Sequence, residues 1–238
     1  MSNIKNMVKW EFILLSRYYI IHISILSVIL YFLSTQAIPD MDNSKFHTML
    51  LFFDPATIGL LFIGALVLFE KSENILQALV VTPMQVDDYI LSKILSLTIL
   101  SVISASLFMI LLTIFGDVEF DILFFCLGII LSSIMLILLG FILVSRVKSI
   151  NEYLLSMAVA FLGLSFPPML HISGLYENII FYAWPTHASL TLFKGVFFAS
   201  GIELWEIAYG IGYQVFWIVL LYLLAKKAFH KYIVLKGG

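Results

Sequence analysis

Residues 70–93, EKSENILQALVVTPMQVDDYILSK, form a charged, amphipathic insert between two apolar runs of membrane-spanning length. The whole chain is 62% hydrophobic and only 12% charged. Soluble globular proteins carry about 25% charged residues, so this composition indicates an integral membrane protein. Such a chain has few places to meet water, and we expect this insert to be where it meets another protein.

The apolar runs on either side of the insert predict an all-α integral membrane protein. A chain of 238 residues has room for six membrane-spanning helices of about 20 residues with short connections. We see no separate soluble domain, so residues 1–238 are expected to form one transmembrane domain. After the insert, the third span should run to about Phe115. The other expected spans are 18–37, 49–69, 122–144, 153–166 and 206–224.

Two further elements are expected outside the spans. Residues 1–17 alternate apolar and charged side chains in a way that predicts an amphipathic helix in the headgroup plane. Residues 169–205 are apolar but interrupted, and fit two helices at 175–183 and 187–199 that are too short to cross. We interpret this stretch as a re-entrant hairpin on the outer side, tolerated because protein covers the break.

Prolines mark two expected helix boundaries. Proline lacks the amide proton and pushes the preceding residue out of the α region, so the fifth span should stop at Pro167 and Pro168. Asp54 and Pro55 fit an N-cap and first helical position, which would start the second helix at Pro55. A helix from Pro55 to Phe69 would be only about 22 Å long, which is too short to cross the hydrocarbon core of a bilayer. Either the preceding segment completes the crossing, or the bundle shelters a kink.

The insert itself predicts a short helix, a corner and a second helix. Residues 71–81 can form one helix with an apolar face that includes Leu76 and Leu79. Thr82 and Pro83 then fit the N-cap and first position of a helix that continues into the third span. One interpretation is a loop whose apolar face rests on lipid. The other is a docking element that a partner holds, passing force into the third span.

The distribution of lysine and arginine predicts the orientation. If the N-terminus is cytoplasmic, eleven basic residues lie on the inner side and only Lys45 and Lys194 lie outside. This is a strong positive-inside bias. We therefore expect a multi-pass protein of the cell membrane, with both termini and the 70–93 insert in the cytoplasm.

Several common sites are missing from the sequence. No G-x-x-x-x-G-K-[ST] motif is present to hold ATP phosphates, and the five histidines show no metal-ligand spacing. Cys126 is the single cysteine and cannot form a disulfide within the chain. We expect no catalytic residue, metal or cofactor in this chain. Transport driven by ATP would need a second polypeptide as its ATPase.

Four segments of the sequence resemble the permease subunits of ABC-2 type transporters, and most closely the branch of fluoroquinolone exporters. The resemblance is detailed over about residues 54–100 and extends to the whole chain in topology. The segments are Asp54–Gly59 (DPATIG), Phe62–Lys71 (FIGALVLFEK), Ala78–Pro83 (ALVVTP) and Tyr89–Lys93 (YILSK).

The resemblance implies that the insert is a coupling helix docked on a separate cytoplasmic ATPase, which is the subunit that uses ATP. The 1–17 helix would be the connecting helix beside it. Two permease copies, or this chain and a sister permease, would pair around a path for hydrophobic or amphipathic cargo such as drugs. The residues expected to carry coupling are Glu70, Lys71, Glu73, Asn74, Leu76, Leu79, Thr82 and Pro83.

Two other classes of function stay open at this point. The chain could be a membrane scaffold or lipid-binding subunit that uses no ATP and whose insert binds something else. It could also be an intramembrane enzyme, for which Ser165 in Gly163-Leu164-Ser165 is the only superficial candidate and lacks an assignable base. A neighbouring reading frame that encodes a P-loop ATPase would favour the exporter over both.

Overall fold

The computed structural model describes residues 2–37, 43–76 and 86–234, and over these residues the chain is helical with short connections. Six of the described helical segments are long and apolar enough to cross a membrane, which confirms the predicted fold class. The elements in chain order are α1 Ser2–Arg17, α2 Ile20–Ala37, α3 Asn43–Ala56, η1 Thr57–Phe62, α4 Ile63–Ser72, α6 Val86–Gly116, α7 Ile122–Arg146, α8 Ile150–Ser173, η2 Ile179–Ala183, α9 Pro185–Phe197, η3 Ala199–Gly201, α10 Leu204–Phe229 and η4 His230–Val234.

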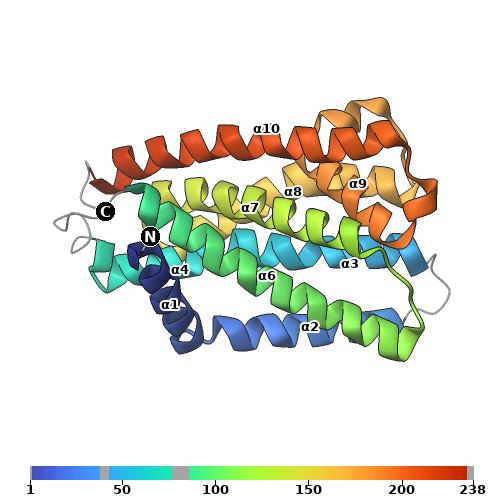
Figure 1. The fold of residues 1–238 in the computed structure, drawn as a ribbon. Helices are drawn as coiled ribbons and strands as arrows, with labels where there is room; N and C mark the ends of the chain where they lie inside the picture. Colours follow the sequence, from blue (N-terminus) through green and yellow to red (C-terminus); the bar gives the residue numbers. More distant parts are fainter. Residues whose placement is uncertain (1, 38–42, 77–85, 235–238) are drawn as a thin grey trace.

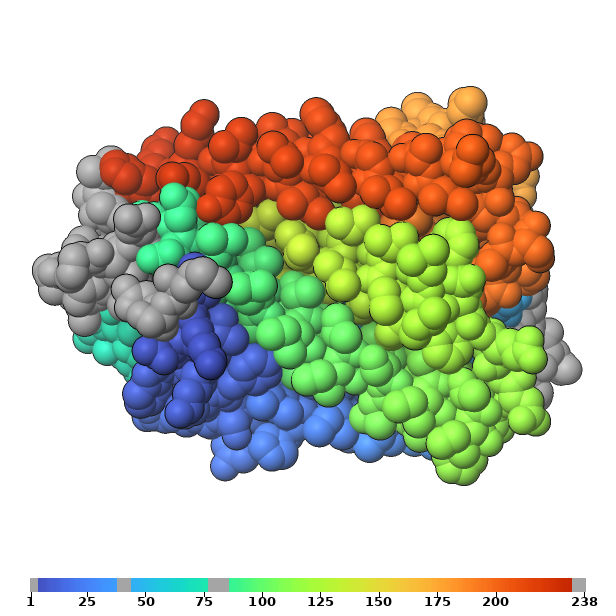
Figure 2. All heavy atoms as spheres, viewed as in Figure 1, coloured from blue at the N-terminus to red at the C-terminus, as the bar shows by residue number. Residues whose placement is uncertain are grey.

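The long helices run side by side and give an elongated bundle with two distinct ends (Figure 1). At one end, α1 lies across the bundle beside the end of α4 and the start of α6; we call this the α1 end. At the other end, the short α9 and its flanking 3-10 turns lie between α8 and α10; we call this the α9 end. In the space-filling view α10 lies along one edge of the face and α2 along the opposite edge, with α6 and α7 between them (Figure 2).

Burial separates the inner spans from the outer ones. In the span Ser44–Ser72, 78% of the most apolar 18-residue stretch is buried inside the bundle. In α2, α8 and α10 only 17% of the corresponding stretch is buried. The inner span approaches α7 closely, because a Cβ on Gly140 would lie 2.4 Å from the carbonyl oxygen of Gly59. Glycine at this crossing lets the two backbones meet, as is common between membrane helices. The sparsely buried helices expose apolar side chains suited to lipid or a second subunit.

The second span is continuous through Pro55, so the expected N-cap at Asp54 is wrong. Pro55 lies inside α3, and the helix widens into the π-helical turn η1 directly after it. The preceding segment therefore completes the crossing. Asp54 is buried, and the Oγ atom of Ser104 on α6 lies 2.8 Å and 2.6 Å from its two carboxylate oxygens. Its polar role is a contact between α3 and α6 and not a cap.

The fifth span also passes through its prolines, contrary to expectation: α8 continues to Ser173. Prolines 167 and 168 cannot donate to the carbonyls four residues earlier, at Gly163 and Leu164. The indole Nε1 of Trp184 donates to the Gly163 oxygen at 2.8 Å, and the hydroxyl of Thr186 donates to the Leu164 oxygen. Side chains from the start of α9 thus replace both missing backbone donors, and the helix need not end.

The segment between α8 and α10 carries a cluster of aromatic rings around two histidines. The Nε2 atom of His187 on α9 lies 2.8 Å from Nδ1 of His171 on α8. Tyr209 on α10 donates to the carbonyl of Tyr182 at 2.7 Å, and its hydroxyl lies 3.4 Å from Nδ1 of His187. The cluster therefore joins α8, α9 and α10 at the α9 end. Burial, and then the neighbouring His171 and Lys194, lowers the pKa of His187 to about 4.

Candidate coupling site

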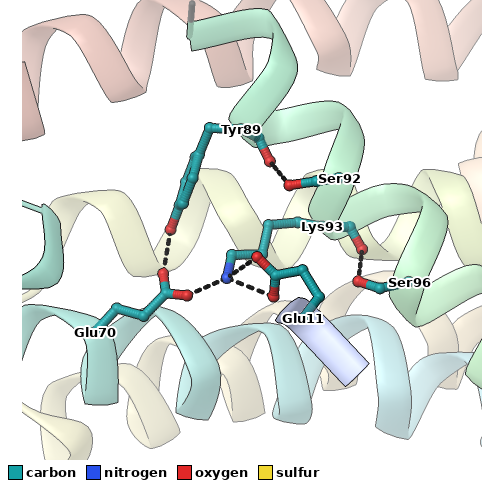
Figure 3. A network of polar contacts seen from close by, with 6 residues as sticks. All are labelled: Glu11, Glu70, Tyr89, Ser92, Lys93 and Ser96. Carbon is teal, nitrogen blue, oxygen red and sulfur yellow. Dashed lines mark hydrogen bonds and ion pairs between the residues drawn. The ribbon is translucent and has the colours of Figure 1, made fainter. Parts of the chain in front are cut away.

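A buried ion cluster lies at the α1 end, where the 70–93 insert leaves α4 and enters α6 (Figure 3). The Nζ atom of Lys93 on α6 is 2.8 Å from both carboxylate oxygens of Glu11 on α1. It also donates to Oε1 of Glu70 on α4. The hydroxyl of Tyr89, one turn before Lys93, donates to Oε2 of Glu70 at 2.5 Å. Three helices that are distant in sequence therefore share one polar contact, which we call the ion cluster.

Charged side chains in this cluster are almost inaccessible. Lys93 is 0% exposed, Glu70 2% and Glu11 5%. Removing such charges from water is costly unless each has partners, so the cluster depends on all its members being present. Burial raises the pKa of Glu11, which the Lys93 ammonium then opposes and the carboxylate of Glu70 reinforces. Two carboxylates and one ammonium leave one excess negative charge in the cluster when all three are ionised.

Local sequence explains how α6 and α4 present these groups. Tyr89 and Lys93 are four residues apart, so their side chains leave the same face of α6. The Nζ atom of Lys93 lies 5.1 Å from the centroid of the Tyr89 ring, within the range of a cation–π contact. Glu70 stands two residues before the end of α4. The cluster consequently joins the two helices that flank the insert.

Other polar contacts surround the ion cluster at the α1 end. The Nζ atom of Lys71 donates to the carbonyls of Val144 and Val147 at 3.3 Å and 3.1 Å, where α7 ends and its last carbonyls lack helix partners. Glu73 forms a long, exposed ion pair of 3.8 Å with Arg17 at the end of α1. These contacts tie the end of α4 to α7 and to α1.

The start of α6 is likewise tied to the last span. Asp87 accepts hydrogen bonds from the Tyr222 hydroxyl at 2.9 Å and from Nζ of Lys226 at 2.7 Å, and both donors lie on α10. Through α1, α4, α6, α7 and α10, most of the bundle is therefore connected to the two ends of the insert.

The structure places the eight expected coupling residues in three groups. Leu79, Thr82 and Pro83 lie outside the described residues. Glu70 and Leu76 are buried within the chain, each 2% exposed, so neither offers a surface to a partner. Lys71, Glu73 and Asn74 are more accessible. The helix expected over 71–81 is interrupted: α4 runs on to Ser72, and a turn follows with Asn74 at a positive φ of 59°.

The sequence-based site omitted Glu11, Tyr89 and Lys93, although these residues form most of the ion cluster. The four-residue spacing of Tyr89 and Lys93 was a usable signal, because it puts both on one helix face next to a carboxylate at the end of the preceding span. Glu11 had no such signal, since 82 residues separate it from Lys93. Over the described ranges, no three His, Cys, Asp or Glu side chains are grouped to hold a metal ion.

Comparisons with known proteins agree with this architecture. The model of the fluoroquinolones export permease protein family matches residues 2–237. Two curated proteins are each 27% identical over 185 residues, which cover 78% of this chain and 77% of each relative. Both are named fluoroquinolones export permease protein, and they come from Mycobacterium tuberculosis strains CDC 1551 / Oshkosh and ATCC 25618 / H37Rv. No solved structure gives a significant match.

The family match covers nearly every residue, including all six helices that can span a membrane and both sides of the insert. The chain is a multi-pass membrane permease, and it belongs to the fluoroquinolones export permease protein family.

Proposed function

We propose that this chain is the membrane-spanning subunit of an ATP-driven exporter that moves amphipathic drugs, with fluoroquinolones as the first class to test. The observation that carries the proposal is the ion cluster, which joins α1, α4 and α6 where the insert begins and ends. Family membership supports transport, and the names of the relatives support export and this class of cargo.

The ATPase would be a separate subunit that holds the 70–93 insert from the cytoplasm, and two permease copies, or this chain and a sister permease, would pair. Closure of the ATPase would displace the insert, and α4 and α6 would move together because Glu70 on α4 and Lys93 on α6 form an ion pair. The α1 helix would move with them through the ion pair between Glu11 and Lys93. The bundle would then change between inward-open and outward-open states as a rigid-body movement. In this scheme the chain itself holds no cofactor, and ATP is used by the partner.

The energy source is tested by reconstitution. We expect liposomes that contain the chain and a P-loop ATPase encoded beside it to accumulate a fluoroquinolone only when ATP is supplied. Liposomes with the chain alone should show no uphill movement. Active accumulation by the lone chain would contradict the proposal.

Docking of the insert is tested by one substitution and a matched control. Leu79→Asp should abolish co-purification with the ATPase while membrane insertion stays normal, because it puts a charge on the expected apolar face of the insert. Leu175→Asp, at an exposed apolar position of the α9 end, is the control and should co-purify normally. Leu76 is a poorer choice, since it is buried and its substitution would disturb folding as well. Equal co-purification of both variants would remove the docking claim.

The orientation is tested by labelling single cysteines after Cys126 has been replaced by serine. An external, membrane-impermeant maleimide should label a cysteine at Ser44 and should not label one at Asn74. The reverse result would place the insert outside the cell and exclude contact with a cytoplasmic ATPase.

A further inference from the structure

One carboxyl group lies deep inside the bundle without a basic partner. Asp54 is on the second span, where α3 packs against α6, and it is 1% exposed. No ion pair within the described ranges of the chain includes it. Its polar contact is Ser104, whose Oγ atom lies 2.8 Å and 2.6 Å from the two carboxylate oxygens. Ionisable side chains inside a membrane are costly and commonly mark a functional site, so Asp54 needs a physical explanation.

Hydrogen-bond counting favours a protonated acid at Asp54. Ser104 has one hydroxyl proton, but three acceptor oxygens lie within its reach: the two of Asp54 and the carbonyl of Ser101 at 3.2 Å. An ionised carboxylate would share that single donor and would carry an uncompensated buried charge. A carboxylic acid supplies a second proton. Its O–H can donate to Oγ of Ser104, and the hydroxyl of Ser104 can then donate to Ser101.

Among the described residues, the helices around α3 present no cation to Asp54. The helix packs against α2, α6, α7, α8 and α9. On α2, Tyr31 is affected by the charge of Asp54, and its hydroxyl lies 3.0 Å from Oγ1 of Thr57. On α3 itself, Lys45 and His47 lie about two turns or more before Asp54. Ionisable side chains on the neighbouring helices have other partners: Lys93 has Glu11 and Glu70, Tyr153 has the carbonyl of Leu60, His171 has His187, and Lys194 has Glu206.

The backbone next to Asp54 departs from a regular α-helix. Pro55 has no amide proton, so it cannot donate to the carbonyl of Leu51 four residues earlier. The π-helical turn η1 follows directly over Thr57–Phe62. Such turns are rare and are frequently found at functional sites. Because prolines and π turns are where helices bend, we expect this span to change shape beside Asp54.

The π turn also sets the direction in which Asp54 points. Sixteen residues separate Asp54 from Glu70, and in a regular α-helix their side chains would point about 160° apart. One extra residue in a turn reduces this angle by about 100°. Both carboxyl groups consequently face α6, where Ser104 contacts the first and Lys93 contacts the second. The turn thus places a second acidic group of the same span against α6, about three helical turns from the ion cluster.

We propose that Asp54 is a proton-binding site inside the membrane domain, which holds a proton in the present packing and releases it when α3 and α6 separate during transport. On release the carboxylic acid becomes a carboxylate, and the proton passes to a water molecule that has reached the site. An ionised Asp54 is stable only where water solvates it, so release favours the separated state and protonation favours the closed one. The site goes beyond the proposed function, because ATP-driven export needs no titratable group in the membrane. Only the release step rests on that function.

The bound proton is tested by infrared spectroscopy of the purified full chain in detergent near neutral pH. A carboxylic acid has a carbonyl band that a carboxylate lacks. We expect Asp54→Asn to remove one such band and Asp121→Asn to leave it in place. Asp121 is the matched control, because it is the N-cap of α7 and asparagine fills that role equally well. An unchanged set of carboxylic acid bands in Asp54→Asn would overturn the site.

Release of the proton is tested with the same variant in the complete transporter. Asparagine is neutral and can still bond to Ser104, but it has no acidic proton to release. We expect Asp54→Asn to keep the thermal midpoint of the wild type and to lose ATP-dependent export. Asp54→Glu, which can still exchange a proton, should export more than Asp54→Asn does. Equal export by Asp54→Asn and the wild type would show a purely structural acid and overturn the release step.

A measurement on the unaltered chain does not depend on how the variants fold. Isotope-labelled aspartate shifts the carbonyl band of Asp54 and separates it from the bands of glutamic acids. In the complete transporter, we expect the labelled band to weaken when a non-hydrolysable ATP analogue holds the ATPase closed, because Asp54 has then lost its proton. A band of constant strength would overturn the release step.

A bound sodium ion and a failed export function each give a distinct result. Sodium at Asp54 predicts a thermal midpoint that rises with added sodium chloride in the wild type and not in Asp54→Asn, and this would overturn the proposal. If the wild-type complex exports no fluoroquinolone although the labelled band depends on Asp54 and on nucleotide, the export function is wrong and the proton site stands. If the wild type and Asp54→Asn export equally, the function stands and proton release is wrong.

Discussion

The two ends of the bundle hold their helices together by different chemistry. At the α1 end, buried charges satisfy one another, and Lys93 alone contacts carboxylates from two other helices. At the α9 end most contacts are between aromatic rings and imidazoles, and the Lys194–Glu206 ion pair there is longer, at 3.9 Å. Buried charges have few alternative partners, so they favour a fixed geometry. Neutral rings tolerate rearrangement more readily. One end is therefore held mainly by buried ion pairs and the other mainly by ring contacts.

The largest expected effect comes from breaking the ion cluster. Lys93→Met should destabilise the folded chain by about 3–5 kcal/mol, because it leaves the carboxylates of Glu11 and Glu70 buried without a cation. Thermal unfolding in detergent measures this loss. Adding Glu11→Gln and Glu70→Gln to the same chain should recover much of the stability, since the unpaired charges are then gone. If the single and the triple variant unfold alike, the buried charges do not set the stability of this end.

The next effect is a pH dependence that belongs to the α9 end. His187 has its pKa lowered from 6.5 to about 4, so between these values the unfolded chain binds the proton and the folded chain does not. Stability should be constant above pH 6.5 and should fall by roughly 3 kcal/mol as the pH decreases toward 4. The groups that face His187 are His171 on α8, Tyr182 on η2, Tyr209 on α10 and, further along α9 itself, Thr191 and Lys194.

Comparison with His187→Gln isolates this dependence. The variant should lose most of the decrease between pH 6.5 and pH 4, measured as the change in thermal midpoint across the range. If the decrease persists in full, other groups cause it, and the α9 end is not the pH-sensitive one.

A smaller effect is expected where α9 supplies the donors that the prolines of α8 lack. Thr186→Val removes the hydroxyl that donates to the Leu164 carbonyl and leaves that partly buried acceptor unpaired, which should cost about 1 kcal/mol. Ser156→Ala on the exposed face of α8 is the control, because its hydroxyl bonds only to Glu152 within the same helix. Equal thermal midpoints for the two variants would show that Thr186 does not support the proline-containing turn.

The same contact shows where inference from sequence stops. Apolar run length predicts the six spans, because a bilayer demands about 20 apolar residues whatever the helix contacts. Local rules at Pro55 and Pro167 predict helix boundaries, and they fail because the missing donors for α8 come from Trp184 and Thr186, which are distant in sequence. A rule based only on neighbouring residues cannot predict a hydrogen-bond donor that lies so far away in the sequence.

The ion cluster illustrates the same limit for function. Helical spacing places Tyr89 and Lys93 on one face, and the charge pattern marks the ends of the insert. Which carboxylates meet Lys93 depends on how α1 crosses the bundle, and that crossing is set by tertiary packing. The sequence marks the insert by its charges, but it does not show that Glu70 faces the chain itself, where it is 2% exposed.

The smallest expected effect tests whether burial, and not charge pairing as such, distinguishes the α1 end. Arg17 and Glu73 form an ion pair at the same end, 3.8 Å apart, but their side chains are 66% and 37% exposed. Water screens such a pair, and ordering two long side chains offsets its attraction, so Arg17→Gln should change stability by less than about 1 kcal/mol. Because dissolved ions screen exposed charges, the small stability difference between Arg17→Gln and the wild type should become smaller still at high salt. Thermal midpoints of Arg17→Gln and Lys93→Met, measured side by side at low and high salt, decide the matter. If Arg17→Gln lowers the thermal midpoint as much as Lys93→Met does, ion pairs stabilise the α1 end whether they are buried or exposed. The role proposed for the ion cluster would then extend to the exposed pair of Arg17 and Glu73.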